Sequence, residues 1–308
     1  MPTQKVKTEH AGERVDVFIN RFTDTSRSQV QKSIKQGEVT INDHTIKPHT
    51  LVQEGDLVFF PTTLRMQPLE KKGPLPSLTI LYEDDAILVI EKQAGVIVHE
   101  VHILDQEQSL ADALVAYCPE IKEVGDDPSR PGIVHRLDRQ VSGVMVIAKT
   151  SASFSHLKQQ FKDRTIKKEY LALVYGELPK DHDVITLKIA RSKTLGRMVA
   201  RPEDQEGKEA ITEYTVLERY KIATFVKINI HTGRTHQIRA HFKAVDHPIV
   251  GDPLYKKKMM KNIHPIKMDR LFLHAHKLTI TLMDGTQRTF ESPLPLSLQN
   301  LLQTLSKN

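Results

Sequence analysis

The sequence of 308 residues predicts an α+β fold, in which a small α+β module precedes a domain built on a mixed, mostly antiparallel sheet with flanking helices and basic tracts. Strand patterns dominate from residue 78 onward and do not alternate regularly with helices, which argues against a doubly wound parallel sheet. Residues 64–77 are rich in proline and lack periodicity, so they are expected to form a linker between the two parts. Apolar residues make up 39% and charged residues 27% of the chain, which is typical of a globular protein.

Residues 13–63 have the pattern of a small binding module. Apolar residues recur on one face of a first helix, at Val15, Phe18, Ile19 and Phe22. Ser26 and Gln29 have the spacing of a capping box, so a second helix should begin there, and Gly37 should end it. Short strands are expected near residues 39–41 and 57–60.

The second of these helices contains few apolar residues. Arg27, Lys32 and Lys35 lie on it and are not needed for its core. We therefore expect these three cations to contact the phosphates of a binding partner.

Residues 78–308 are expected to form one larger domain. The predicted strands cover residues 78–82, 86–90, 133–134, 144–147, 170–174, 211–217, 224–230, 278–282 and 288–290. The predicted helices cover residues 109–117, 154–161, 235–245 and 294–305, the last of them a closing amphipathic helix of leucines.

Several classes of protein are disfavoured. The single cysteine, Cys118, cannot form an intramolecular disulfide, which favours a reducing, cytoplasmic compartment. The longest apolar run, residues 86–90, is far shorter than the roughly 20 residues of a membrane span. The N-terminus lacks the apolar stretch of a secretory signal. We expect a monomer that does not bind membranes.

The positive charge of the chain is concentrated in three tracts. The chain has 44 basic and 38 acidic residues, a formal net charge of +6. Residues 149–168, 186–201 and 255–270 each carry five or six basic residues and at most one acid. The tracts indicate a footprint for a phosphate backbone, although three ordinary solvated faces would give the same pattern.

The most informative segment reads GIVHRLDRQVSG, at residues 132–143. It places Asp138 in a polar loop between two predicted strands, a rigid support for a carboxylate at a cleft. Arg136 and Arg139 flank Asp138 and favour its ionised form. On charge alone, a surface loop that holds an ion pair is the better explanation.

This segment resembles the signature loop of the RluA-type pseudouridine synthases, H-R-L-D-x-x-T-S-G. Residues 168–176 resemble the K-x-Y-x-A-x-V-x-G strand of that family, and residues 232–241, continuing to 252, resemble its third motif. Residues 273–275 match its late L-H-A strand. The N-terminal stretch resembles the RNA-binding module named after a small-subunit ribosomal protein.

The sequence departs from the family pattern at four places. Val141 stands where threonine is usual, and Asp246 and Lys256 stand where glycine is usual. Glu91, Lys92 and Gln93 replace the usual N-K-P. The loss of the threonine hydroxyl makes the rigidity of the loop an open question, and the other departures concern local turns and RNA contacts.

The resemblance implies an enzyme that isomerises uridine to pseudouridine within RNA, with no cofactor and no metal. It gives Asp138 the catalytic role at the sugar–base bond, Arg239 the role of its counter-charge, and Tyr170 a place against the uracil. Because the target nucleotide must leave the stack, the resemblance implies that Arg136 fills the gap. The residues that support these motifs are His135, Leu137, Ser142, Gly143, Gly233, Arg234, His236 and Gln237.

Two other readings stay open on the residues alone. His231, His236 and His241, together with the pair His274 and His276, are the ligand type of a metal-dependent hydrolase, although a five-residue spacing suits one helix face poorly. A catalytically inactive RNA-binding or ribosome-assembly factor is the third class. The resemblance implies a structured RNA substrate, either large-subunit ribosomal RNA or tRNA, and the N-terminal module favours ribosomal RNA.

Overall fold

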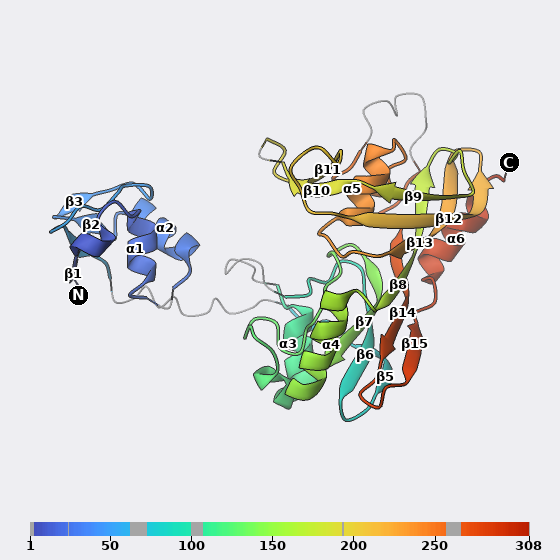
Figure 1. The fold of residues 1–308 in the computed structure, drawn as a ribbon, viewed down its shortest axis with the longest axis horizontal. Coiled ribbons are helices and arrows are strands. Elements are labelled where there is room, and N and C mark those ends of the chain that lie inside the picture. Colours follow the sequence, from blue (N-terminus) through green and yellow to red (C-terminus); the bar gives the residue numbers. More distant parts are fainter. Residues whose placement is uncertain are drawn as a thin grey trace. The chain divides into compact units, whose positions relative to one another are not determined.

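The computed structural model describes residues 3–23, 25–61, 73–99, 107–192, 194–256 and 266–307. The chain divides into two compact units, residues 1–72 with 101–107 and residues 73–100 with 108–308, each of which is considered by itself (Figure 1). Among the described residues, no helix is long and apolar enough to cross a membrane.

The N-terminal unit combines two helices with a four-stranded sheet. The elements are β1 (Thr3–Lys5), a 3-10 turn η1 (Thr8–His10), α1 (Val15–Asn20), α2 (Arg27–Lys35), β2 (Thr40–Ile41), β3 (His44–Thr45) and β4 (Leu57–Phe59). The strand order is β1-β4-β2-β3. The side chain of Gln29 accepts from the backbone N–H of Ser26 at 2.7 Å, which confirms the capping box. Gly37 follows α2 with a φ of +76°, in the left-handed region that suits a helix stop.

The apolar face of α1 faces the core of this unit. Val15, Phe18 and Ile19 are fully buried, and they pack with Val30 of α2. Phe22 was expected to extend this face. That expectation is wrong, because α1 ends at Asn20 and the Phe22 side chain is 43% exposed.

The larger unit is built on a nine-stranded sheet. Its strands are β5 (Thr79–Glu83), β6 (Ile87–Lys92), β7 (Ser142–Ala148), β8 (Lys167–Tyr175), β9 (His182–Thr186), β12 (Ile211–Tyr220), β13 (Ala223–Ile230), β14 (Leu273–Thr281) and β15 (Gln287–Glu291). The order is β5-β6-β7-β14-β8-β13-β12-β9, with β15 paired to β14. Within the described part of this sheet, β7 and β14 pair in parallel and the other neighbours are antiparallel. The predicted mixed, mostly antiparallel sheet is therefore confirmed.

Strand β14 lies at the centre of the sheet, between β7 and β8. Ala275 is opposite Gly143 in the parallel pair. Gly143 has a φ of +124°, and a side chain there would place its Cβ only 2.1 Å from the carbonyl oxygen of Ala275. The close approach of the two strands therefore requires glycine at this position of the motif.

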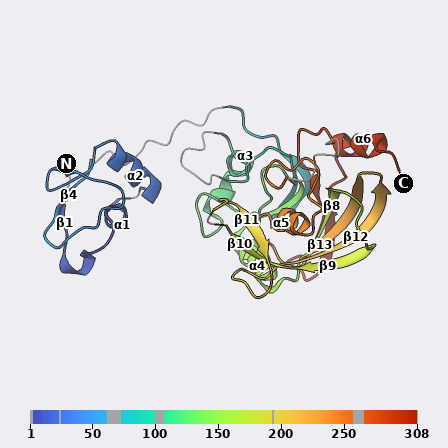
Figure 2. The same cartoon turned by 90° about the horizontal axis from the view of Figure 1, so that it is seen from above.

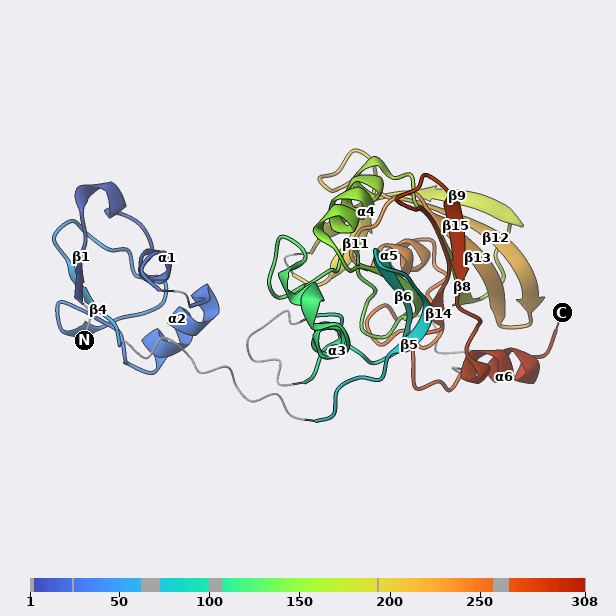
Figure 3. The ribbon, with the colours of Figure 1, turned by 90° about the horizontal axis from the view of Figure 1, so that it is seen from below.

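Helices cover this sheet at several places. They are α3 (Leu110–Tyr117), α4 (Ser151–Asp163), α5 (Gln237–Ala244) and α6 (Leu296–Thr304), with a 3-10 turn η3 at Pro119–Glu123. Helix α4 packs on β7 and β14, and α5 packs on β12 and on a separate hairpin of β10 (Lys188–Arg191) and β11 (Met198–Arg201). Figures 2 and 3 show the strands β8, β13 and β12 curving beside α5.

Two sequence expectations for this unit need correction. Residues 133–134 form no strand, because Ile133 makes only a single bridge, to Ile147. Strands β9, β10 and β11 were not predicted, since their sequences mix charged and apolar residues. The apolar face predicted for the closing helix is confirmed, because Leu298 is fully buried and Leu294, Leu301, Leu302 and Leu305 pack against the core, whereas Leu296, which is not part of that face, is 73% exposed.

Candidate active site

A buried lysine holds the loop that carries Asp138. Lys92, at the end of β6, is 1% exposed. Its ammonium donates hydrogen bonds to the main-chain oxygens of Gln93 at 2.9 Å, Val96 at 2.8 Å and Arg139 at 3.1 Å. Burial lowers the pKa of Lys92 to about 7, although nearby Asp138 acts in the opposite direction. The loop is thus fixed through the residue that follows Asp138.

The first and third motifs meet at an ion pair. Arg239, on α5, donates from Nη1 to Oδ2 of Asp138 at 3.0 Å. The side chain of Arg239 is 5% exposed and that of Asp138 is 18% exposed, so the arginine is enclosed while the carboxylate still faces the cavity. The two residues were predicted as partners from the family resemblance, and the structure brings them together.

A second carboxylate fixes the arginine from its other edge. Asp252 accepts from Nε of Arg239 at 2.7 Å and from Nη2 at 2.9 Å, the two-pronged geometry that suits a guanidinium. Asp252 also accepts from the backbone N–H groups of Leu254 and Tyr255, at 2.8 and 3.1 Å. Burial opposes the charge of Arg239, but Asp252 and Asp138 outweigh it and raise the pKa of Arg239 above its usual range. The guanidinium of Arg239 therefore links two carboxylates. Of these two, Asp138 lines the cavity and Asp252 does not.

Sequence analysis missed Asp252 and Lys92 as site residues. Asp252 was noted only as the last residue of a motif, and Lys92 only as part of a departure from the family pattern. Two features of the sequence could have indicated them. Asp252 is an acid that follows a glycine in an otherwise apolar segment, and Lys92 is a lysine at the end of an apolar strand.

A small cavity of about 60 Å³ surrounds Asp138. Its lining comprises Arg136, Leu137, Asp138, Val141, Tyr170, His236, Gln237, Ile238, Arg239 and Leu273. Burial and the charge of Asp138 both raise the pKa of Tyr170 above its usual range, so its hydroxyl remains protonated.

A wider cleft of about 370 Å³ shares Arg136 and Tyr170 with the small cavity. Lys162, Arg164 and Lys168 also line this cleft. Arg136 is exposed, and its Nη1 lies 3.5 Å from Nε2 of His99. The cavity and the cleft together offer a carboxylate, an aromatic ring and several cations to one substrate.

His236 lies next to Asp138 and lines the same small cavity. Its Nε2 is 3.7 Å from Oδ2 of Asp138, and its Nδ1 is 3.0 Å from the hydroxyl of Tyr255. His236 has a φ of +55°, in the left-handed region, at the start of α5. The turn before the helix thereby directs the imidazole toward the carboxylate.

Several motif residues support the backbone of the site. His135 Nε2 accepts from the N–H of Val146 at 3.0 Å, and burial lowers the pKa of His135 to about 3, so its ring is neutral. Gln237 accepts from Thr232 Oγ1 at 2.7 Å and from the N–H of Arg234 at 3.1 Å, which closes the turn containing Gly233. Leu137 is buried beside the cavity.

Ser142 belongs to a buried hydrogen-bond chain. Its hydroxyl accepts from Arg270 Nη2 at 2.6 Å and lies 2.9 Å from Nδ1 of His274. His274 Nε2 in turn bonds to the carbonyl of Ser292 at 2.9 Å. The serine of the signature loop therefore ties β7 to β14 rather than facing the cavity.

The departures from the family pattern fit their surroundings. Val141 is 3% exposed and presents a methyl surface to the cavity. Asp246 adopts a φ of +68°, a conformation that glycine adopts freely and that aspartate tolerates better than most residues. Lys256 is exposed at the surface.

The remaining histidines have structural partners. His231 pairs with Glu213 at 3.1 Å, and His241 bonds to the carbonyl of Leu187 at 2.9 Å. His276, like His274, bonds to the carbonyl of Ser292. In the described part of the chain, histidine, cysteine and acidic side chains form no group of three or more that could hold a metal ion.

The basic tracts separate into paired and unpaired cations. Lys149 pairs with Glu83 at 2.7 Å, and Lys158 pairs with Asp126. A cleft of about 880 Å³ beside the β10–β11 hairpin is lined by the cations Arg191, Arg201, Lys208 and Arg234. Lys193 and, in the third tract, Lys257, Lys258 and Lys261 lie outside the described residues.

In the N-terminal unit, Arg27 differs from the other two predicted RNA contacts. Arg27 donates to the buried carboxylate of Asp16 at 3.0 Å, so it supports the packing of α1 on α2, contrary to the expectation that it is not needed there. Lys32 and Lys35 are exposed on α2.

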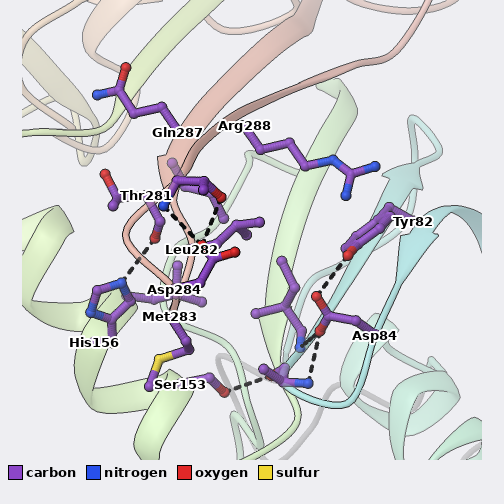
Figure 4. A pocket seen from close by; sticks show the side chains of 15 residues that line it. Tyr82, Asp84, Ser153, His156, Thr281, Leu282, Met283, Asp284, Gln287 and Arg288 are labelled. Atoms are coloured by element: carbon purple, nitrogen blue, oxygen red, sulfur yellow. Dashed lines mark hydrogen bonds between the residues drawn. The ribbon is translucent and has the colours of Figure 1, made fainter.

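The larger unit has a further cavity, of about 440 Å³, between α4, the β5–β6 turn and the β14–β15 hairpin (Figure 4). Its polar groups largely satisfy one another. Tyr82 donates to Asp84 at 2.8 Å, His156 bonds to the carbonyl of Thr281 at 2.9 Å, and Arg288 stacks 3.9 Å from the ring centre of Tyr82. It shares no lining residue with the cavity around Asp138.

Comparisons with known proteins agree with this geometry. Residues 86–244 match the family model described as RNA pseudouridylate synthase, and residues 13–58 match the S4 domain. An uncharacterized RNA pseudouridine synthase of Aquifex aeolicus is 41% identical over 254 residues, covering 81% of this chain and 78% of that protein. The ribosomal large subunit pseudouridine synthase D of Neisseria meningitidis serogroup B is 34% identical over 316 residues, covering 97% and 80%.

A solved structure shares the fold of the larger unit. Human RNA Pseudouridylate Synthase Domain Containing 1 superposes with a TM-score of 0.61 at 27% identity, covering 77% of this chain and 91% of that one. The predicted motifs, the mixed sheet and the S4 domain are thus found together in one chain. The chain belongs to the RNA pseudouridylate synthase family, and it is an RNA pseudouridine synthase, an isomerase that converts uridine in RNA to pseudouridine.

Proposed function

We propose that this enzyme modifies large-subunit ribosomal RNA, with Asp138 as the residue that acts at the sugar–base bond. The observation that carries the proposed role is the pair of Asp138 with Arg239, in which a charged carboxylate faces a cavity while its counter-charge is enclosed. An unpaired carboxylate in such a place would be neutralised instead. The arginine therefore keeps a reactive anion available next to a bound nucleotide.

Tyr170 and Arg136 are proposed to handle the base. Tyr170 lines both the small cavity and the wider cleft, where its ring can stack on uracil and its protonated hydroxyl faces the reacting edge. Arg136 is exposed between the same two spaces. Its planar cation suits the gap that an extruded nucleotide leaves in an RNA stack.

The unpaired cations are proposed to bind the RNA backbone on both sides of the target. Arg234 lines both the 370 Å³ cleft and the 880 Å³ cleft, so it lies where the two meet. Arg164 and Lys168 line the first cleft, and Arg191 and Arg201 line the second. Phosphates would neutralise these side chains, for which no carboxylate partner is seen in the described residues.

Ribosomal RNA is favoured over tRNA by the combination of the catalytic unit with an S4 domain and by the name of the Neisseria relative, a ribosomal large subunit pseudouridine synthase. We propose residues 13–63 as the RNA-docking module, 64–77 as the linker and 78–308 as the catalytic domain. We also propose that the enzyme works as a monomer in the cytoplasm, where the buried Cys118 stays reduced.

Mapping of pseudouridines in total RNA tests the target. RNA from a strain that lacks this protein is compared with RNA from the same strain complemented with the wild type or with Asp138→Asn. The wild type should restore specific pseudouridines in large-subunit ribosomal RNA. Restoration in tRNA alone would contradict the proposed target.

The same variant tests the role of Asp138 in vitro. Asparagine keeps the shape of the side chain but supplies neither the charge nor a proton acceptor. Turnover should fall by about 10²-fold or more, as expected for loss of a catalytic group, while RNA binding persists. Residual turnover well above one-hundredth of the wild type would contradict the assigned role.

A further inference from the structure

The protonation pattern of His236 is fixed by its neighbour Tyr255. The hydroxyl of Tyr255 lies 2.8 Å from the carbonyl oxygen of Met198, and because a carbonyl oxygen only accepts, the single hydroxyl proton lies in that bond. The phenol oxygen must then accept from Nδ1 of His236, 3.0 Å away. A neutral imidazole carries one N–H. The other nitrogen, Nε2, is consequently a bare hydrogen-bond acceptor.

His236 stays neutral in this site. Burial lowers the pKa of His236, in spite of nearby Asp138, and the charge of Arg239 adds to the lowering. Its Nε2 and Oδ2 of Asp138 are 3.7 Å apart, so two acceptors lie side by side with no proton between them. The His236 and Asp138 side chains are 21% and 18% exposed, which leaves both accessible from the cavity. Such a pair is complementary to a donor group on the substrate.

Uridine in RNA offers two donors, the ribose 2′-hydroxyl and the N3–H of uracil. The 2′-hydroxyl is attached to the carbon next to C1′, on the sugar side of the bond that breaks, whereas N3 lies on the base side, with C2 between it and N1. A carboxylate that acts on the sugar side of this bond therefore has the 2′-hydroxyl as the nearest donor of the target nucleotide. An acceptor 3.7 Å from that carboxylate is within reach of the hydroxyl.

We propose that Nε2 of His236 accepts a hydrogen bond from the 2′-hydroxyl of the target nucleotide, and that His236 thereby selects ribose over deoxyribose at the position that reacts. This inference rests on the proposed role of Asp138 at the sugar–base bond. The 2′-hydroxyl is the group by which a protein distinguishes RNA from DNA at a given nucleotide.

The test is a double-mutant cycle between His236 and the substrate. Two short RNAs span a uridine identified by the mapping, one all-ribose and one with 2′-deoxyuridine at the target alone. Single-turnover rates of the full-length wild type and of His236→Phe are measured on both. The ribose preference is a ratio within one protein, so partial unfolding of a variant cancels in it. The intrinsic effect of the hydroxyl on the chemistry is common to all the proteins and cancels when the preference of a variant is compared with that of the wild type.

The wild type should prefer the ribose substrate by about tenfold or more, the size of one well-placed hydrogen bond. In His236→Phe the preference should fall at least several-fold. His236→Gln places an oxygen near the position of Nε2 and should retain part of it. Tyr255→Phe frees the imidazole to change tautomer and should lower the preference without removing it.

His182→Phe serves as the matched control, because His182 is an exposed histidine paired with Glu213 outside the cavity, and it should keep the full preference. An unchanged ribose preference in His236→Phe would overturn the inference, even where its rates on both substrates drop. The outcome is separate from the proposed function, which fails when the restored pseudouridines lie in tRNA alone or when Asp138→Asn remains active.

Discussion

Nη1 of Arg239 lies 3.0 Å from Oδ2 of Asp138, although 101 positions separate the two residues in sequence. The opposite edge of the same guanidinium is held by Asp252 at 2.7 and 2.9 Å. The orientation of the counter-charge is therefore set by a residue that does not line the cavity.

Asp252→Asn should impair catalysis through Arg239. An amide offers one acceptor and one donor, so the two-pronged bond is lost and the guanidinium can turn away from Asp138. We expect kcat to fall by about 10- to 100-fold with little change in RNA affinity, since catalytic geometry is sensitive to small displacements. Arg239→Met should have a similar effect, and the double variant should be little worse than either, because the residues act as a unit.

The control for this prediction is Asp269→Asn, which alters an exposed acid. It should leave kcat unchanged. Fully additive losses in the double variant would contradict the view that Asp252 acts through Arg239.

Lys92→Met should loosen the loop that carries Asp138. It removes three buried hydrogen bonds and leaves the carbonyls of Gln93 and Val96 without that partner. We expect a loss of about 2 kcal/mol in the free energy of unfolding of the catalytic unit. We also expect a fall in kcat on the fraction that stays folded. Urea unfolding and single-turnover rates are the measurements.

Lys221→Met removes an exposed lysine and provides the comparison. A Lys92→Met protein with wild-type unfolding and wild-type rates would show that Lys92 does not support the loop.

The stability of the N-terminal unit should depend on pH through Asp16. Burial alone would raise the pKa of Asp16, but hydrogen bonds from Arg14, Gln31 and Arg27 outweigh it and lower the pKa to about 2. A lowered folded-state pKa contributes stability above the unfolded value of 3.8, and this contribution is lost as the pH falls toward 2. The difference corresponds to about 2 kcal/mol.

Asp16→Asn should therefore destabilise this unit at pH 7 and remove most of its stability change between pH 5 and 2. Methyl NMR signals of Val15 and Ile19, followed in urea, report the unit within the intact chain. Asp43→Asn alters an exposed aspartate in a left-handed turn that asparagine also tolerates, and it should behave as the wild type. An unchanged pH dependence in Asp16→Asn would assign that dependence to other acids.

Deletion of residues 1–64 should weaken binding to the natural folded RNA and flatten its salt dependence. Each phosphate contact that is lost lowers the log–log salt slope by about 0.7 to 0.9. Saturated turnover on a minimal RNA should change little, because the residues around Asp138 all lie after residue 78. Changing Lys32 and Lys35 to alanine in the intact chain should reproduce part of the effect on binding.

Thermal unfolding of the truncated protein is the control for its fold. A well-folded truncated enzyme that is equally impaired on long and short RNAs at saturation would show that the N-terminal unit is not a docking device.

The parts of the fold that depend on local sequence could be predicted. The capping box at Ser26, the apolar faces of α1 and α4, the continuous apolar run of β8 and the alternation in β13 are encoded within a few residues. The pair of Asp138 and Arg239 was predicted only through the family motifs, because its two members lie on separate elements.

Other features depend on contacts that the sequence does not display. Asp252 gains its role because the segment after α5 returns to the buried side of Arg239. In the sequence, Lys92 cannot be distinguished from a solvent-exposed lysine. Its role follows from a hydrogen bond of its ammonium to the carbonyl of Arg139, which is distant in sequence. The tautomer of His236 depends on the carbonyl of Met198, which comes from a hairpin that was not predicted.

The central position of β14 has a consequence for synthesis of the chain. The sheet places this strand between β7 and β8, yet β8 ends at Tyr175 and β14 begins only at Leu273. A nascent chain therefore contains Asp138, Tyr170 and Arg239 before β14, the strand that joins β7 to β8, has been synthesised. Until then the facing edges of β7 and β8 lack their partner, and open edges invite pairing with other chains. A product truncated before Leu273 would contain every proposed catalytic side chain and still form no enzyme.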